Sequence, residues 1–460
     1  MPALRAAAVF LFLMLASPAT AANDADADTA QVIADNWSIV FGTPEETVAA
    51  ATRLRDRGKT DVIPTIILAM RYAETKVTVL KPLFRMLTGH EPNSWHDSML
   101  WLERHPEVKA HESYRAIKMF LLARIDPKFL QFLGGGRSEP SRMRIRLAEV
   151  AWGGVKVDGI PSLDNPKLIT AAEADYLVDS DEVFGVAING DVRAYPLRIM
   201  GWHEMFNEII GGVPVALAYC TLCGSGILYE TQVPGFEKPL VFGSSGFLYR
   251  SNKLMFDRTT LSLWNQFTGK PVAGPLVDAG IELKVRPVTI TTWGKWRKTH
   301  PETKVLSLET GTDRNYGSGV VYSDYFASPE LMFPVVVRDE SIVKRKDYVF
   351  GLRVAGGARA WPLKAFEGGR VINDKVGLKN VVLVGDAASR TVRAFFRDDQ
   401  EFQAGPDAAT LKGPGGHWQV AEDFLAGPGG TKLPRAPGAV SYWFPWENYF
   451  GTGTSLYGRD

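Results

Sequence analysis

The chain has 460 residues, which at roughly 150 residues per domain predicts two or three domains, each large enough to bury a core. Its 52 basic and 51 acidic side chains give a formal net charge of +1. No general attraction for nucleic acid or for anionic lipid is therefore expected. Only two cysteines occur, Cys220 and Cys223, so disulfides do not hold the fold together.

The first residues are typical of a secretory signal peptide. An apolar run follows Arg5, and Ala19, Thr20 and Ala21 form an A-x-A cleavage pattern. This run is too short to span a bilayer, and no later segment reaches the roughly 20 uncharged apolar residues that a membrane helix requires. Residues 1–22 are therefore expected to be removed, and the mature protein is expected to be periplasmic without a membrane span.

Residues 30–135 are expected to form an α-helical, HEAT-like segment. Thr43, directly before a proline, is a predicted N-cap, and apolar residues such as Val48 and Ala51 recur at helical spacing. A glycine-rich run at 134–138 indicates a linker after this segment. The helical segment is the expected contact surface for a protein partner.

The sequence beyond residue 150 changes to short apolar or alternating runs, which predict strands and hairpins. The run V-F-G-V-A-I-N-G-D-V-R-A-Y-P-L at Val183 aligns without a gap with V-F-G-L-R-V-A-G-G-A-R-A-W-P-L at Val349, an offset of 166 positions. We therefore predict an α+β fold, in which the helical segment precedes two tandem, internally duplicated β-rich modules, 150–325 and 326–460.

The offset also shows where the two modules differ, and the differences cluster by chemistry. Opposite four residues of the first module, the second module has Gly369 for His203, Arg370 for Glu204, Asp386 for Cys220 and Ser389 for Cys223. We expect a helix over 198–210, a strand over 213–219 and a return strand over 227–229. The two cysteines then lie in the intervening hairpin, near His203.

The hairpin motif C-T-L-C-G-S-G is typical of a metal-binding knuckle, in which the glycine allows a left-handed turn. Cys220, Cys223 and His203 would supply three ligands that suit copper(I) or zinc. Glu204 is the catalytic candidate beside an open coordination position, as a fourth ligand, as a base for bound water or as the partner that orients His203. We therefore predict an exported copper or zinc protein, and whether it catalyses a reaction stays open.

Two other functions stay open. The C-x-x-C pattern in an exported protein is also typical of a thiol–disulfide redox pair, which Cys220 and Cys223 would form without a stoichiometric metal. Alternatively, the chain is a non-catalytic interaction scaffold that binds a partner through its helical segment. A scaffold would keep its function when both cysteines are replaced.

Candidate substrate-binding residues lie outside the hairpin. The run from Phe242 to Arg258 combines a Gly/Ser turn with Tyr249 and Arg250. Each arginine is able either to bind an anionic substrate or to pair with a carboxylate that positions the loop. His300 has Phe450 opposite it, so this histidine also belongs only to the first module.

Several long motifs occur together in this chain: W-H-E, Y-C-T-L-C-G-S-G, Y-R-S-N-K-L-M-F-D-R-T-T-L-S-L-W-N-Q and T-T-W-G-K-W. In these the chain resembles the bacterial family catalogued as domain of unknown function 3179, over Asp158 to Tyr457. The family's usual knuckle has Pro where this chain has Thr221, a change expected to loosen the turn without removing a ligand. The resemblance implies that the motifs belong together, and it supplies no activity.

Overall fold

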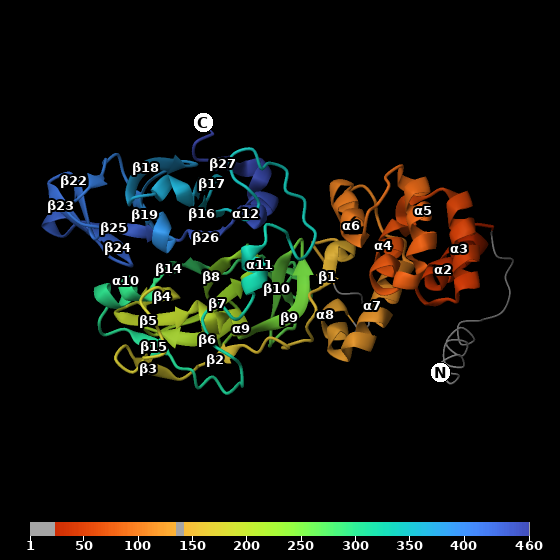
Figure 1. Ribbon diagram of the computed structural model, residues 1–460, viewed down its shortest axis with the longest axis horizontal. Coiled ribbons are helices and arrows are strands. Elements are labelled where there is room, and N and C mark those ends of the chain that lie inside the picture. The colour runs from red at the N-terminus through yellow and green to blue at the C-terminus, as the bar shows by residue number, and fades with distance from the viewer. Residues whose placement is uncertain (1–23, 135–141, 460) are drawn as a thin grey trace. The chain divides into compact units, whose positions relative to one another are not determined.

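The computed structural model describes residues 24–134 and 142–459, so the expected signal peptide lies outside the described residues. Helices come first and β-rich sheets follow (Figure 1), which confirms a mixed α+β fold. The chain divides into two compact units. The helical unit runs up to Ser98 and includes His105–Lys118, and the β-rich unit contains Met99–Arg104 and the chain from Met119 onward. None of the described helices is both long and apolar enough to cross a membrane.

The helical unit is built from α2 (Asp24–Phe41), α3 (Pro44–Arg57), α4 (Ile63–Tyr72) and α5 (Val77–Thr88), while α6 (Trp95–Arg104) and α7 (Ser113–Ile125) contribute to both units. Thr43 caps α3 as predicted: its side chain accepts a hydrogen bond from the Glu46 N–H at 3.2 Å, and the Glu46 carboxylate accepts one from the Thr43 N–H at 2.7 Å. This reciprocal pair satisfies two backbone donors at the start of α3. Ala51 is buried, whereas Val48 faces solvent.

In the β-rich unit, α8 (Leu130–Leu133) precedes a first sheet region, residues 150–306, with three five-stranded sheets among the described residues. One sheet has the order β1 (Val150–Trp152), β9 (Phe242–Tyr249), β10 (Asn252–Asp257), β11 (Leu263–Asn265) and β12 (Lys270–Ala273). The next has the order β13 (Val285–Arg286), β8 (Ser225–Glu230), β7 (Val213–Cys220), β6 (Met205–Ile210) and β2 (Leu163–Asp164). The third has the order β14 (Thr289–Thr292), β4 (Glu182–Ile188), β5 (Asp191–Pro196), β15 (Lys304–Leu306) and β3 (Leu168–Thr170).

A second sheet region covers residues 348–456. Its four-stranded sheet has the order β26 (Ala439–Tyr442), β16 (Tyr348–Val354), β17 (Gly357–Pro362) and β27 (Thr454–Leu456). Its larger sheet has the order β18 (Arg370–Val376), β19 (Lys379–Asp386), β20 (Thr391–Arg397), β25 (Lys432–Ala436), β24 (Phe424–Ala426), β23 (Gly416–Val420), β22 (Thr410–Gly413) and β21 (Gln403–Ala404). Short helices α9 (Leu197–His203) and α10 (Trp293–Thr299) belong to the first region, and α12 (Trp443–Phe450) to the second.

The same arrangement of strands occurs in both regions. The β4–β5 hairpin pairs with β14 on one side and, in parallel, with β15 on the other, just as the β16–β17 hairpin pairs with β26 and, in parallel, with β27. A glycine in the hairpin makes room for a tryptophan in each case. A Cβ on Gly185 would lie 2.2 Å from the Trp296 ring, and a Cβ on Gly351 would lie 2.2 Å from the Trp446 ring.

The two sheet regions share one hydrophobic core. Phe184 and Leu217 of the first region and Phe350 and Leu383 of the second belong to the same cluster of buried side chains. In Figure 1 the green strands of the first region and the blue strands of the second lie against each other within the unit, and β8 and β26 are in contact. Residues 307–347, here called the connecting segment, join the two regions and contain the short helix α11 (Ser323–Ala327).

Candidate functional site

The predicted cysteine hairpin is formed by β7 and β8, with the single turn η5 (Thr221–Cys223) between them. Cys220 pairs with Ser225 at the end of the ladder, and Gly224 then adopts the left-handed conformation (φ 58°) that its sequence position predicts. A Cβ at Gly224 would also meet the Tyr348 ring at 2.8 Å. Glycine is therefore required both by the turn and by the packing of the second sheet region against it.

The two thiols lie in contact and are almost fully buried. Cys220 is 2% exposed and Cys223 is 0% exposed, and both are free cysteines. The Cys220 S–H donates to Cys223 Sγ across 2.6 Å, and the side-chain amide of Asn252 donates to the same sulfur at 3.2 Å. Burial, together with the hydrogen bond from Cys220, raises the pKa of the Cys223 thiol well above its ordinary value. Cys223 is thus held as a neutral thiol.

His203, the last residue of α9, has partners for both ring nitrogens away from the sulfurs. Its Nδ1 lies 2.9 Å from the carbonyl oxygen of Pro161, and its Nε2 lies 2.6 Å from the hydroxyl of Tyr316. Burial lowers the pKa of His203, which favours the neutral ring. A neutral ring has one N–H, so it donates to Pro161 and accepts from Tyr316.

A three-ligand metal group is not assembled in this arrangement. Over residues 24–134 and 142–459, no three His, Cys, Asp or Glu side chains gather in a way that could hold a metal ion. The structure brings Cys220 and Cys223 together, and it directs His203 to Pro161 and Tyr316. The copper or zinc site of the sequence analysis stays a prediction.

The expected helix over 198–210 is wrong beyond its first half. Glu204 has φ 55°, which ends α9 at His203, and the next six residues form β6 in register with β7. The turn gives His203 and Glu204 different surroundings. Glu204 is 6% exposed, and its carboxylate accepts from the Thr221 hydroxyl at 2.8 Å and from the Lys253 ammonium at 3.1 Å.

Sequence analysis missed Lys253, which is 3% exposed and also donates to the backbone oxygen of Glu204 at 3.3 Å. The signal was present, because Lys253 directly precedes the apolar run Leu254 to Phe256 within one strand. A charged side chain at a fully buried strand position needs a partner of opposite charge. Identifying that partner required the position of the turn at Glu204.

A cavity of about 50 Å³ adjoins Lys253 and Glu204. Its polar wall includes Cys220, Glu204, Thr221, Lys253 and Tyr322, and its apolar wall includes Val155, Ile160, Phe247, Leu248, Met332 and Phe333. Tyr322, Met332 and Phe333 come from the connecting segment, so this segment forms part of the cavity wall. Cys220 lines the cavity, and Cys223 is not among its lining residues.

The connecting segment is fastened directly to the cysteine turn. The hydroxyl of Tyr325, in α11, donates to the carbonyl oxygen of Leu222 at 2.7 Å, and Leu222 is one of the two residues between the cysteines. The Lys346 ammonium lies 3.8 Å from the centre of the Tyr325 ring and donates to the carbonyl oxygens of Tyr325 and Ser328. These contacts hold the connecting segment against the turn that carries the two cysteines.

The two candidate arginines have carboxylate partners within the protein. Arg250 Nε donates to Glu149 at 2.5 Å, and the guanidinium of Arg258 makes two hydrogen bonds to Asp158, at 2.8 and 3.0 Å. Tyr249, the third candidate of this strand, accepts a hydrogen bond at its backbone oxygen from the Tyr449 hydroxyl. Both arginines are thus paired with carboxylates of the protein itself, which is one of the two roles expected for them. A role in substrate binding stays a prediction.

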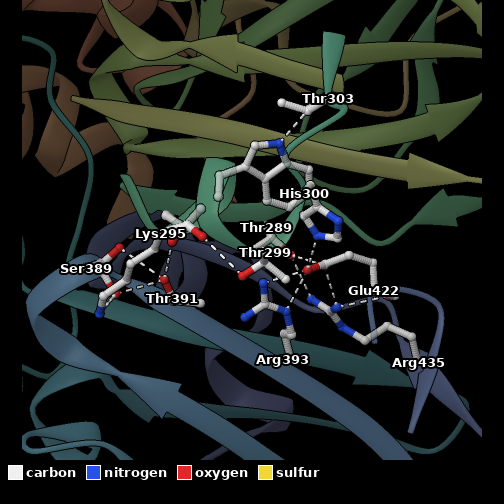
Figure 2. A network of polar contacts seen from close by, with 12 residues as sticks. Thr289, Lys295, Thr299, His300, Thr303, Ser389, Thr391, Arg393, Glu422 and Arg435 are labelled. Atoms are coloured by element: carbon white, nitrogen blue, oxygen red, sulfur yellow. Dashed lines mark hydrogen bonds and ion pairs between the residues drawn. The ribbon is translucent and has the colours of Figure 1, made fainter. Parts of the chain in front are cut away.

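His300 lies in a polar network between the two sheet regions (Figure 2). Its Nε2 is 3.5 Å from a carboxylate oxygen of Glu422, which also binds Arg393 at 2.5 Å, Arg435 at 3.2 Å and the Thr289 hydroxyl at 2.8 Å. Burial by itself raises the pKa of Glu422, but Arg393, His300 and Arg435 together hold it well below its ordinary value. His300 therefore belongs to the interface between the sheet regions.

Comparison with known proteins places the motifs in one family. No curated protein and no solved structure matches the chain. A family model, however, covers residues 157–453, which include the cysteine hairpin, most of the cavity lining and most of both sheet regions. The resemblance inferred from the motifs is thereby confirmed: the chain belongs to the family described as "Protein of unknown function (DUF3179)".

Proposed function

We propose that this protein is a thiol–disulfide redox protein in which Cys220 and Cys223 form the redox pair. The observation that supports this most directly is the 2.6 Å contact between the two free sulfurs. A disulfide requires a separation of about 2.05 Å, so oxidation needs a sulfur movement of about half an ångström. The hairpin already holds the two side chains on one side of the turn.

The surroundings of the pair also favour reversible chemistry. Both states of the pair carry no charge when the thiols are protonated, so burial penalises neither of them. In contrast, a buried thiolate is penalised, as the raised pKa of Cys223 indicates. The C-x-x-C loop is short, so its closure contributes little to stability, and the disulfide remains open to reduction.

An equilibrium titration tests the proposal. The protein is incubated to equilibrium in mixtures of reduced and oxidised dithiothreitol, the remaining thiols are trapped by alkylation after unfolding, and the intact mass is measured. We expect both thiols to disappear together with a single midpoint, and no such transition in Cys220→Ser. Thiols that stay reduced in every mixture would contradict the proposal.

Copper or zinc binding is the second candidate, because the turn also suits thiolate ligands. Asn252 donates to Cys223 Sγ, and Gly224 has the left-handed conformation found after the second cysteine of a metal knuckle. Two thiolates alone are able to hold copper(I). Elemental analysis of protein prepared without chelator is the test: we expect any bound metal to fall in Cys220→Ser, and to persist in His203→Ala because that ring faces Pro161 and Tyr316.

We also propose that the two sheet regions arose by internal duplication. Equivalent polar contacts support this. Asn207 exchanges two hydrogen bonds with the backbone of Phe242, as Asn373 does with that of Phe402. Similarly, Glu208 accepts from Arg193 and Tyr195, and Asp374 accepts from Arg359 and Trp361.

For the helical unit, we propose a HEAT-like arrangement in which α2 pairs with α3 and α4 pairs with α5.

Export to the periplasm is a further part of the proposal. It is supported by the charged residue, apolar run and A-x-A pattern of residues 1–22. Mass spectrometry of the protein purified from cells tests it. We expect an N-terminus directly after Ala21 or Ala22 in a periplasmic extract, and a mature chain that still begins at Met1 would contradict it.

A further inference from the structure

We infer that the cavity beside Cys220 is the substrate site of the redox pair, and that its substrate is a small hydroperoxide. This inference rests on the proposed redox function and goes beyond it by naming the substrate class. It follows from three properties of the cavity: its volume, the chemistry of its lining and the cysteine among its lining residues.

The volume sets an upper limit on what can reach the sulfur. Pockets for drug-sized ligands have volumes of about 300–1,000 Å³, whereas this cavity has about 50 Å³. A disulfide peptide, or a loop of a partner protein, does not fit into that space while the connecting segment stays in place. Hydrogen peroxide, with two non-hydrogen atoms, is only slightly larger than the water that such a cavity holds.

The lining fits a small molecule that is polar and uncharged. Lys253 and Glu204 bring opposite charges, so the polar wall carries no net charge to attract an ion. An ammonium group has three N–H donors, and two contacts of the Lys253 ammonium go to Glu204. A peroxide oxygen near the ammonium would accept a hydrogen bond, and the apolar wall, which includes Phe247 and Met332, would limit the space for a larger substituent.

The two cysteines differ in their relation to the cavity, and this difference assigns their roles. Cys220 lines the cavity and supplies the attacking sulfur. It forms a bond to one peroxide oxygen while the O–O bond breaks, so that sulfur is oxidised to sulfenic acid and the other oxygen leaves as water with the thiol proton. Lys253 is placed to stabilise the negative charge that develops on the departing oxygen.

Cys223, in contact with Cys220, completes the reaction. Its sulfur, 2.6 Å from Cys220 Sγ, attacks the sulfenic acid: the S–S bond forms, the S–O bond breaks, and the hydroxyl leaves as water with the proton of Cys223. In total, two thiols and one hydrogen peroxide give one disulfide and two waters. Reduction back to the thiol state by disulfide exchange with an external dithiol requires the connecting segment to open first, because the closed cavity does not admit a dithiol.

The test compares two peroxides of different size on the full-length protein. Reduced protein is mixed with hydrogen peroxide or with cumene hydroperoxide, thiols are trapped at intervals, and the second-order rate of their loss is measured by mass. We expect hydrogen peroxide to react roughly tenfold faster or more, because the cavity excludes the larger molecule. Met332→Ala, which shortens an exposed side chain of the apolar wall, should reduce this preference, and Met86→Ala, an exposed methionine of the helical unit, should not.

A second measurement assigns the attacking sulfur. The protein is treated with hydrogen peroxide and then unfolded in the presence of dimedone, which should label Cys220 in Cys223→Ser and leave Cys220→Ser unlabelled. Equal rates for the two peroxides, or a label only in Cys220→Ser, would overturn the inference. If these results contradict the inference but the dithiothreitol titration still shows a two-thiol transition, the redox function stands and the peroxide substrate is wrong. If the dithiothreitol titration shows no transition either, the redox function is wrong as well.

Discussion

Lys253 and Glu204 form an ion pair whose two side chains are only 4% and 8% exposed. Taking both charges out of water is unfavourable, and their attraction together with the hydrogen bond from Thr221 offsets that penalty. Such a pair fixes the positions of its members more than it stabilises the fold. Lys253, Glu204 and Cys220 all line the cavity, so the ion pair fixes the Lys253 ammonium group in the same cavity wall as Cys220.

A double-mutant cycle measures the dependence of each charge on the other. Lys253→Met leaves the Glu204 carboxylate buried without its cation, so we expect a loss of about 3–5 kcal/mol in the free energy of unfolding. Adding Glu204→Gln removes the remaining charge and should restore part of that loss. Denaturant unfolding of the two single variants and the double variant gives the coupling, and strictly additive losses would show that the two side chains do not act as a pair.

Lys118, in the helical unit, is a second buried cation, and it makes a prediction about pH. Burial and the nearby positive charge of Arg71 lower its pKa from 10.5 to about 7, although its ammonium donates to the Tyr114 hydroxyl at 3.2 Å. Between about pH 7 and 10.5 the unfolded chain then binds more protons at this site than the folded chain does, so stability rises with pH. From this residue we expect a gain of about 2 kcal/mol between pH 7 and 9.

Lys118→Met should remove that pH dependence and stabilise the helical unit at pH 7. Thermal unfolding followed by far-ultraviolet circular dichroism at both pH values is the measurement. Lys109→Met, at an exposed position, is the matched control and should keep the wild-type profile. An unchanged slope in Lys118→Met would mean that Lys118 keeps an ordinary pKa in the folded protein.

At the scale of elements, the cysteine hairpin could be predicted because it depends on local pattern. The motif from Cys220 to Gly226 specifies its own turn, and β7 and β8 form where the apolar runs predict strands. The segment Met205–Ile210 could not be assigned in this way. Its apolar residues suit either a helix or a strand, and pairing with β7 decides for the strand.

The same limit applies to the candidate site. Sequence placed His203 and Glu204 on one helix, with His203 as a metal ligand beside the cysteines and Glu204 near an open coordination position. The left-handed residue Glu204 separates them, so that one faces Pro161 and Tyr316 and the other faces Lys253. A single backbone dihedral angle decides which of the two lies near Cys220, and residue spacing carries no information on it.

The repeated glycine–tryptophan contact makes a prediction for both hairpins. Gly185→Ala and Gly351→Ala each place a methyl group 2.2 Å from a buried tryptophan ring, so the ring or the strand must shift. We expect each variant to lose about 1–3 kcal/mol of stability. Gly453→Ala is the control, because nothing lies within 4 Å of its Cβ position. If only one of the two hairpin variants is destabilised, the two contacts are not equivalent.

At the scale of the whole β-rich unit, the shared core and the polar network of Figure 2 join the two sheet regions. Glu422 is the centre of that network, with a side chain that is 10% exposed and contacts to Arg393 and Arg435. Sequence could not identify it, because its arginine partners are distant in sequence or lie on another strand. Neither its spacing nor its local pattern distinguishes Glu422 from a solvated glutamate.

Glu422→Gln removes the negative charge and leaves two buried or half-buried guanidinium groups without it. We expect a loss of about 3–5 kcal/mol at neutral pH, because breaking a buried pair leaves an uncompensated charge.

The folded pKa of Glu422 lies below the unfolded one, so its contribution is present above the ordinary value of 4.5 and is lost as the pH falls through the folded pKa. The variant should therefore lose stability less steeply than the wild type on acidification. Urea unfolding over about pH 3–7 measures both effects, and Glu367→Gln, at an exposed position of the same sheet region, should match the wild type throughout. Equal acid sensitivity of Glu422→Gln and the wild type would show that the network does not keep Glu422 charged.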